Sequence, residues 1–415
     1  MKALSRGFLG RAFFITIADA AQKGSTAILS LILARFLGPS EFGVFAAVTA
    51  ASGVIMLSTS IGFEQEMVRR SARSPLSEML SLTHVLVAIT VGVAIVTFGV
   101  YRGLVSGSVV PIALLLIAFS VDAVCRFHLP YRYAGIILGE THVGAVIHSV
   151  ATVVLVSLTL LVLWIARSVA MVLWVQLGVA ILTLAAWELW RRSKHIGHAL
   201  PAGGLSEAKG FVQGALSFAF TNILWVLYFN IGVVMMTSLR SSGDVGVFSA
   251  VYRMVAMTFI FAYAVTSAYG PSLFKAAHEE PARHRPLAVK MMLTLVGVGA
   301  VVSLGLAFCS PFIINLVMGP AFLAGVEAAQ WLSIAAFLRA LNFGFSEILT
   351  TGGRHPWRIG LEGGLLAVYV GLNWLWIPIY GPVGGARAAV AAEAAMTVAG
   401  FALWWAMSRR QVSGR

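Results

Sequence analysis

Apolar residues fill most of this 415-residue chain in long runs, and short polar segments separate the runs. A bilayer core about 30 Å thick needs roughly 20 mostly apolar helical residues per crossing. Twelve runs meet this requirement, at residues 12–37, 42–62, 80–101, 109–129, 142–166, 168–190, 211–239, 245–270, 287–317, 326–350, 358–380 and 383–408. The pattern therefore predicts an all-α polytopic membrane protein with about 12 transmembrane helices.

A short phrase occurs at matching points of the two halves of the chain. Residues 39–48 read PSEFGVFAAV and residues 242–251 read SGDVGVFSAV, so Gly43 corresponds to Gly246 at an offset of 203 residues. Six predicted crossings separate the copies, and an even number places both on the same side of the membrane. We interpret them as matching outer turns in which each glycine opens a helix.

Matching turns on one side of the membrane predict a parallel pseudo-two-fold repeat of two six-helix lobes. The N-terminal lobe is expected at residues 1–190 and the C-terminal lobe at residues 211–415. The charged segment 191–210 is expected to be a cytoplasmic inter-lobe loop. Residues 271–286 form the other long, charged connection, and neither can hold a folded soluble domain.

Composition supports this interpretation, because 59% of the residues are hydrophobic and only 11% are charged, against about a quarter charged in soluble domains. The two cysteines lie in apolar runs without spaced partners, so no disulfide framework or metal site is predicted. The net charge of +13 reflects topology and not nucleic-acid binding. If the N-terminus is cytoplasmic, the inner segments carry 21 Lys or Arg and the outer segments five. The positive-inside rule therefore predicts that both termini are cytoplasmic.

Several charged residues lie inside predicted spans, where each costs about 2.5 to 3.5 kcal/mol unless it has a partner or a water-filled cavity. Lys23 follows Asp19 by four residues and lies beside Gln22, so these side chains share one polar helix face. The candidate substrate-binding residues are Gln22, Lys23, Arg253 and Arg339. A guanidinium suits a diphosphate, since its planar fork donates parallel hydrogen bonds to phosphate oxygens. The alternative is that these charges form interhelical ion pairs.

Coupling to an ion gradient would need a carboxylate that changes its protonation between states. The candidates are Asp19, Glu347, Glu362 and Glu393. Asp122 is set aside because Arg126, four residues later, is expected to neutralise it. No cofactor is predicted beyond coupling to H⁺ or Na⁺.

Three phrases resemble the polysaccharide flippase family, the O-antigen transporters of the multidrug/oligosaccharidyl-lipid/polysaccharide exporter superfamily. LARFLGPSEFGVFAA at residues 33–47 looks like the first outer turn of that family. VGVFSAVYRMV at 245–255 is similar to the start of its eighth helix, and IPIYGPVGGARAAVAAE at 377–393 to the turn that opens its twelfth. The chain departs from the family at Arg387 and Glu393, where small or apolar residues are usual.

The resemblance implies a flippase of the bacterial inner membrane that works by alternating access. Its expected substrate is an undecaprenyl-diphosphate-linked oligosaccharide, the repeat unit of an O-antigen, exopolysaccharide or capsule. Its expected partners are this glycan, the lipid bilayer and the polysaccharide polymerase machinery, without nucleic acid. The resemblance also implies that cationic residues of the first and eighth helices bind the substrate.

Two alternatives remain open. A multidrug or small-metabolite, cation-coupled antiporter of the same superfamily would have a cavity dominated by acids and aromatics, and the balanced intramembrane charges do not decide this. A membrane-bound polysaccharide polymerase or ligase would need catalytic groups in a sizeable outer loop, and every predicted outer connection is short. The sequence therefore favours a transporter and not an enzyme.

Overall fold

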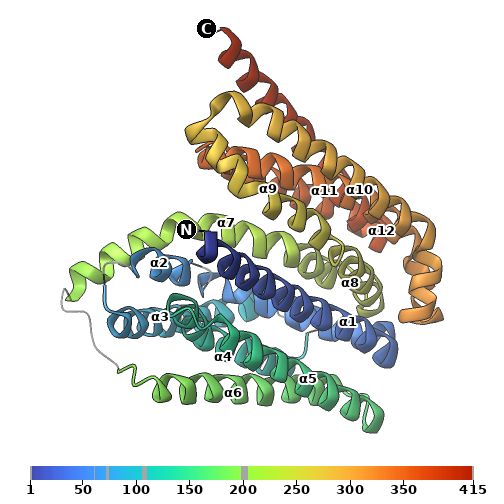
Figure 1. The fold of residues 1–415 in the computed structure, drawn as a ribbon. Helices are drawn as coiled ribbons and strands as arrows, with labels where there is room; N and C mark the ends of the chain where they lie inside the picture. Colours follow the sequence, from blue (N-terminus) through green and yellow to red (C-terminus); the bar gives the residue numbers. More distant parts are fainter. Residues whose placement is uncertain (1, 60, 72–73, 105–109, 198–203, 414–415) are drawn as a thin grey trace. The chain divides into compact units, whose positions relative to one another are not determined.

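The structure is a computed structural model of the chain (Figure 1). Its backbone is described except at residues 1, 60, 72–73, 105–109, 198–203 and 414–415. Side chains are described from residue 28 onward, except at residues 58, 60, 72–73, 101–109, 198–203, 205, 217, 281 and 407–415. No strand occurs in this described part, so the predicted all-α fold class is confirmed.

The described residues form twelve α-helices and two short 3-10 helices. Their bounds are α1 Lys2–Ile55, η1 Met56–Thr59, α2 Phe63–Arg70, α3 Leu76–Leu104, α4 Ile112–Ile137, α5 Thr141–Ile165, α6 Val169–Ser193, α7 Gly204–Leu239, α8 Ser242–Ala256, α9 Phe259–Glu279, α10 Pro281–Val317, η2 Pro320–Gly325, α11 Val326–Thr351 and α12 His355–Ser413.

Two of the helices are double, because a glycine followed by a proline interrupts each of them. Gly38 has φ 73° before Pro39 in α1, and Gly381 has φ 57° before Pro382 in α12. Glycine adopts positive φ without a Cβ clash, and proline cannot donate the helical hydrogen bond. Ten helices among the described residues are long and apolar enough to cross a membrane. The two interruptions account for the difference from the twelve predicted spans.

The charged segment 271–286 is helical, although the sequence analysis treated it as a connection. Helix α9 runs to Glu279 and α10 begins at Pro281, so only Glu280, with φ −136°, leaves the helical region. Proline is tolerated at the first position of a helix because no partner is needed there for its missing N–H.

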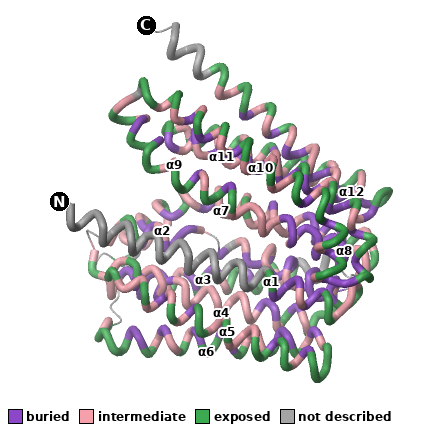
Figure 2. Tube along the Cα trace, turned by 45° about the vertical axis from the view of Figure 1, so that its right-hand side comes forward, coloured by how far each residue is buried: buried purple, intermediate pink, exposed green. Residues whose placement is uncertain are grey.

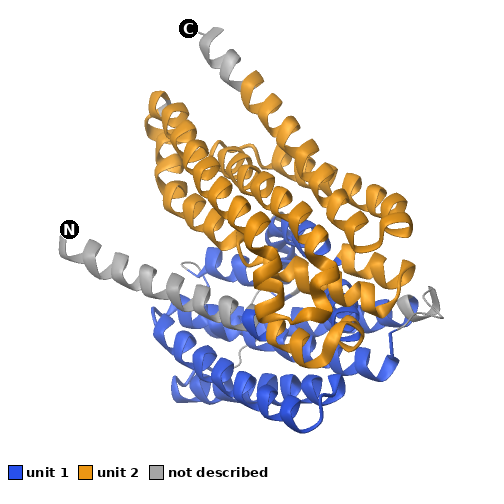
Figure 3. Cartoon of the chain, turned by 90° about the vertical axis from the view of Figure 1, so that its right-hand side faces the viewer, with its two compact units in different colours: residues 1–29, 44–230 blue, residues 30–43, 231–415 orange. Residues whose placement is uncertain are grey.

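The chain divides into two compact units (Figure 3). Unit 1 comprises residues 1–29 and 44–230, and unit 2 comprises residues 30–43 and 231–415. The stretch of α7 up to residue 230, which lies in the predicted C-terminal lobe, is thus part of unit 1. The division into lobes at 191–210 stays a prediction.

Each unit has its own apolar core. In unit 1, side chains of α2, α3, α4, α6 and α7 meet around the fully buried Trp187 and Met67. In unit 2, Leu273 of α9, Met291 and Leu295 of α10 and Ile348 of α11 pack together. These cores fix the helices that carry the polar residues described below.

Large apolar residues are exposed on α5, α6 and α10, helices on which Figure 2 marks exposed residues in green. Trp164 of α5 and Phe308 of α10 are each 81% exposed, and Val301 is 74% exposed. Exposed apolar surface of this extent is what a helix presents to lipid, since hydrocarbon tails are as apolar as the side chains themselves. Together with the ten candidate spans, it identifies the chain as a multi-pass membrane protein.

Candidate functional site

The first residues of the two copies of the repeated phrase, 39–43 and 242–246, pack against each other within unit 2. A Cβ atom on Gly43 would lie 1.8 Å from the carbonyl oxygen of Ser242, and one on Gly246 would lie 1.8 Å from that of Pro39. The contact is reciprocal, because Gly246 is the counterpart of Gly43 and Ser242 is the counterpart of Pro39, each at the offset of 203 residues. Reciprocal contacts are the mark of a two-fold axis. Both glycines lie inside helices, so the interpretation that each opens a helix is wrong; the turn residue is Gly38.

Arg253 lies in α8, seven residues after Gly246, and is partly buried in unit 2. Its Nη1 donates a hydrogen bond to the Ser30 hydroxyl at 2.6 Å. Its guanidinium carbon lies 5.6 Å from the centre of the Phe42 ring, within range of a cation–π interaction. A serine hydroxyl and an aromatic ring hold this guanidinium in place.

Arg339 of α11 and Glu393 of α12 form a buried ion pair. The Arg339 Nη1 lies 3.2 Å from a Glu393 carboxylate oxygen, and the two side chains are 6% and 0% exposed. Asn342 donates to the other carboxylate oxygen at 2.7 Å, and the hydroxyl of Thr397 donates to the Asn342 amide oxygen at 3.1 Å. These contacts are those of an interhelical ion pair, the alternative that the sequence left open. The predicted roles of both residues in a cavity stay predictions.

The other two ion-coupling candidates of unit 2, Glu347 and Glu362, differ in their surroundings. Glu362 accepts a hydrogen bond from Arg358 at 2.8 Å and one from Ser346 at 3.3 Å. Glu347 is partly buried, and its carboxylate occupies the space beside Gly270, where a Cβ would come within 2.7 Å of the Glu347 oxygen. The absence of a side chain at residue 270 therefore makes room for this carboxylate between α9 and α11.

Arg387 of α12, a departure from the family pattern, reaches Glu327 with its Nη2 at 3.2 Å. The same guanidinium lies 5.2 Å from the Trp331 ring centre and 4.9 Å from that of Tyr380. Two rings and one exposed acid therefore surround this charge.

The remaining predicted residues, Asp19, Gln22 and Lys23, belong to α1. Their side chains lie outside the described residues, so their predicted roles stay predictions.

The second predicted span, residues 42–62, is interrupted in unit 1. Helix α1 ends at Ile55, the 3-10 turn η1 follows, and Gly62 with φ 88° precedes α2. A Cβ on Gly62 would also lie 2.6 Å from the Cβ of Phe218 in α7. Both the conformation and the contact require glycine here, so the fold itself fixes the interruption.

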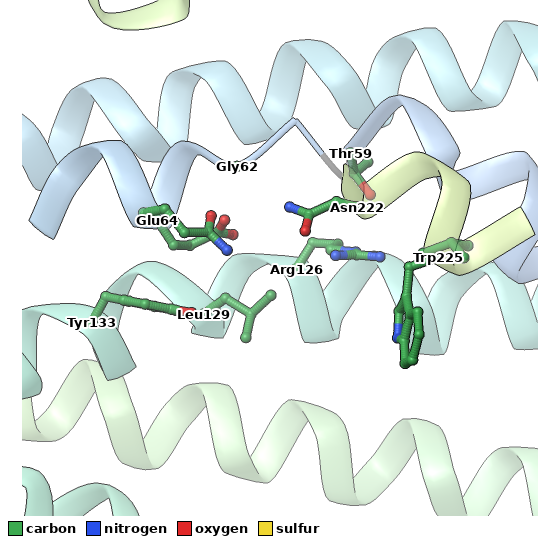
Figure 4. Close-up of a pocket in the computed structure, with 10 residues that line it drawn as sticks. Thr59, Gly62, Glu64, Arg126, Leu129, Tyr133, Asn222 and Trp225 are labelled. Atoms are coloured by element: carbon green, nitrogen blue, oxygen red, sulfur yellow. The ribbon is translucent and has the colours of Figure 1, made fainter. Parts of the chain in front are cut away.

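A cavity of about 180 Å³ lies at this interruption (Figure 4). Glu64 and Gln65 reach it from α2, Arg126 and Tyr133 from α4, and Asn222 and Trp225 from α7. Glu64, Arg126 and Asn222 gather below the chain at Gly62 in Figure 4. Three helices thus bring one acid, one base and two amides to a single cavity.

The Glu64 carboxyl is 8% exposed. Burial raises its pKa above the ordinary value of 4.5, against the opposing effects of its own backbone N–H and of the Arg126 charge. The acid that precedes Arg126 by four residues, Asp122, accepts a hydrogen bond from the Ser52 hydroxyl. Among the residues searched, no three His, Cys, Asp or Glu side chains are grouped to hold a metal ion.

Solved structures define the class of this fold. A lipid II flippase MurJ in an inward closed conformation has a TM-score of 0.73 at 12% identity, covering 93% of this chain and 86% of that one. A multidrug resistance MATE family transporter of the MOP superfamily, in an inward-facing conformation, scores 0.70 at 13% identity over 94% and 96%. A MOP superfamily transporter from Pyrococcus furiosus, with a binding pocket of reverse polarity, scores 0.67 at 14% over 95% and 94%. The chain has the fold of MOP superfamily transporters.

A family model described as polysaccharide biosynthesis protein matches residues 8–277 of the sequence. The match covers well over half of the chain, which therefore belongs to this family. No curated protein matches the sequence.

Sequence reasoning missed the cavity of unit 1 for two reasons. The second predicted span runs to residue 62, so the sequence analysis extended a regular helix over Met56–Thr59, which form a 3-10 helix after α1 ends at Ile55. Glu64 lies just beyond the second predicted span, and the sequence analysis assigned it no role. The one available signal was Arg126, which the sequence analysis treated only as the neutralising partner of Asp122.

Proposed function

We propose that the chain is a flippase that moves an undecaprenyl-diphosphate-linked oligosaccharide from the cytoplasmic to the outer leaflet of a bacterial inner membrane by alternating access. The observation that carries the proposal is the family membership in polysaccharide biosynthesis, joined to a fold shared with a lipid II flippase. A polytopic chain of this family has a bilayer to act on, and the helices among the described residues follow one another through short connections.

Arg253 supplies the chemistry that the proposal needs in unit 2. It lies in a membrane-spanning segment, and the contacts described above orient its guanidinium through a hydroxyl and an aromatic ring. A diphosphate recruits such a cation because bidentate, charge-assisted hydrogen bonds repay the loss of water. In this proposal Lys23 provides a second cation, and a carboxyl among Asp19, Glu347, Glu362 and Glu393 couples transport to H⁺ or Na⁺.

The test is complementation of a deletion strain with Arg253→Ala, Lys23→Ala and Arg253→Lys. We expect both alanine variants to abolish surface polysaccharide at a normal amount of protein in the membrane, and Arg253→Lys to restore part of it. Lys275→Ala is the matched control, because this lysine is 63% exposed beside Glu279 and outside any buried contact. Full activity of both alanine variants would refute the diphosphate-binding role.

A second measurement follows the substrate directly. Purified protein is placed in liposomes with undecaprenyl-diphosphate-linked N-acetylglucosamine, and a membrane-impermeant lectin reports the sugar in the outer leaflet. Protein-dependent transfer supports the flippase. A deletion strain with normal surface polysaccharide and a loss of drug efflux would instead favour the multidrug antiporter.

The orientation in the membrane is a further part of the proposal. The excess of Lys and Arg in alternate connections supports cytoplasmic termini. A C-terminal green fluorescent protein fusion should fluoresce and a C-terminal alkaline phosphatase fusion should be inactive. The reverse result would place the C-terminus outside.

A further inference from the structure

The cavity of unit 1 is a built feature with an unusual balance of charge. The interruption at Gly62 is fixed by its backbone conformation and by its contact with Phe218. The lining holds one acid, Glu64, and one base, Arg126. A phosphate or diphosphate needs a surplus of positive charge, and a cationic ligand needs a surplus of negative charge. A lining with one of each therefore favours a ligand without net charge.

The polar groups of the lining also require a ligand that both donates and accepts hydrogen bonds. The side-chain oxygen of Gln65 is buried and has no hydrogen-bond partner. Asn222, Tyr133 and Arg126 also line the cavity. An amide and a hydroxyl can each donate and accept hydrogen bonds, whereas a guanidinium only donates. A hydroxyl group does both, so a molecule with several hydroxyls satisfies this set.

Trp225 gives the cavity a flat apolar wall. Its side chain is 39% exposed and rests on Phe229, with the ring centres 4.8 Å apart. Leu129 and Val226 extend the apolar part of the lining. A sugar ring has an apolar face of C–H groups and a rim of hydroxyls, which matches an aromatic wall surrounded by amides, an acid and an arginine. At about 30 Å³ per water, the cavity has room for about six waters, which is the scale of one sugar ring.

We propose that the cavity lined by Gln65, Arg126, Asn222 and Trp225 is a subsite for one uncharged sugar residue. The inference rests on the proposed flippase function and adds to it a place in unit 1 that selects the glycan, separate from the cations assigned to the diphosphate.

The test is saturation-transfer NMR on the full-length protein in nanodiscs, with the methyl glycosides of glucose, galactose, mannose and N-acetylglucosamine as probes. We expect at least one glycoside to bind saturably and inorganic pyrophosphate not to displace it. Trp225→Ala should weaken that binding about fivefold to tenfold, as expected for the loss of one well-packed contact. Trp164→Ala is the matched control, since this tryptophan of unit 1 is 81% exposed on α5.

Gln65→Met keeps the proposal testable if Trp225→Ala fails to fold. If Gln65 has only a structural role, Gln65→Met removes a buried oxygen that has no hydrogen-bond partner. The substitution would then raise the thermal midpoint and leave the glycoside affinity unchanged. The proposed subsite instead predicts weaker glycoside binding with the thermal midpoint unchanged or raised. The inference is overturned if no glycoside binds, if pyrophosphate displaces the bound glycoside, or if Gln65→Met binds it like the wild type.

A last arm separates the sources of the sugar. The glycoside that binds best is presented again as its undecaprenyl-diphosphate conjugate, which should displace the free glycoside at a lower concentration. Equal potency would assign the site to free sugars and overturn the role in glycan selection. Glycoside binding without leaflet transfer would refute the flippase and leave the subsite. Leaflet transfer without glycoside binding would refute the subsite alone.

Discussion

Replacing Gly43 or Gly246 by alanine tests the reciprocal helix contact of unit 2. The added Cβ would lie 1.8 Å from a carbonyl oxygen of the other phrase, whereas real Cβ atoms essentially never come closer than 3.0 Å to another heavy atom. The two backbones would therefore have to separate by about 1.2 Å. Neither carbonyl is the end of a flexible side chain, so the separation must move whole helices. Overpacking of this kind costs about 1 to 3 kcal/mol or more.

The measurement is the thermal unfolding midpoint of the purified variants, together with surface polysaccharide in a complemented deletion strain. We expect Gly43→Ala and Gly246→Ala to lower the midpoint by similar amounts, because their contacts are equivalent. The double variant should lose less stability than the two single variants lose together, since one separation of the helices relieves both clashes.

The matched control is Gly371→Ala in α12, where an added Cβ meets no atom within 4 Å. Alanine favours a helix over glycine by about 1 kcal/mol, so this variant should be neutral or stabilised. If Gly43→Ala and Gly246→Ala are as stable as Gly371→Ala, the close contact is refuted. The two-fold relation of the two phrases is refuted with it.

Three further predictions concern single interactions. Arg339→Met should destabilise unit 2 by about 3 to 5 kcal/mol, because it leaves Glu393 buried without its cation. Adding Glu393→Leu should restore most of the lost stability. Equal unfolding midpoints of the single and double variants would contradict this prediction. Because the pKa of Glu64 is raised in the folded protein, the stability of the wild type falls as the pH rises above 4.5 through that pKa. The thermal midpoint of the wild type should therefore fall relative to that of Glu64→Gln as the pH rises. A difference between the two midpoints that stays constant with pH would disprove the shift. Ser241 is the N-cap of α8, and its hydroxyl accepts a hydrogen bond from the Asp244 N–H at 3.3 Å. Ser241→Ala should therefore lower the stability by about 1 kcal/mol in the same assay. An unchanged stability would show that the cap is not formed.

The fold class followed from the sequence because membrane spans are encoded locally, in runs of apolar residues. The charged segment 271–286 was misjudged for the opposite reason, since its Lys, Ala and Glu residues are good helix formers despite being polar. The role of Gly43 could not be read locally either. Its partner in the fold is Ser242, and a turn glycine and a contact glycine look alike in one sequence.

The candidate site was harder to predict because it depends on the register between helices. Arg339 and Glu393 are 54 residues apart, and only the packing of α11 on α12 decides that they meet. The sequence could state that such charges need partners or water, but not which partner each one has. The cavity beside Gly62 was missed because the φ angle of one glycine creates it.

The interruption at Gly62 has a consequence for the hydration of unit 1. Within a bilayer, backbone that is not helical persists only where protein covers it or where it lines a water-filled space. After Ile55 the chain passes into the 3-10 helix Met56–Thr59, and both Thr59 and Gly62 line the cavity. We expect water to fill this cavity, so a cysteine placed at Thr59 should react with a water-soluble maleimide, although residue 59 falls within a stretch that hydropathy alone assigns to lipid.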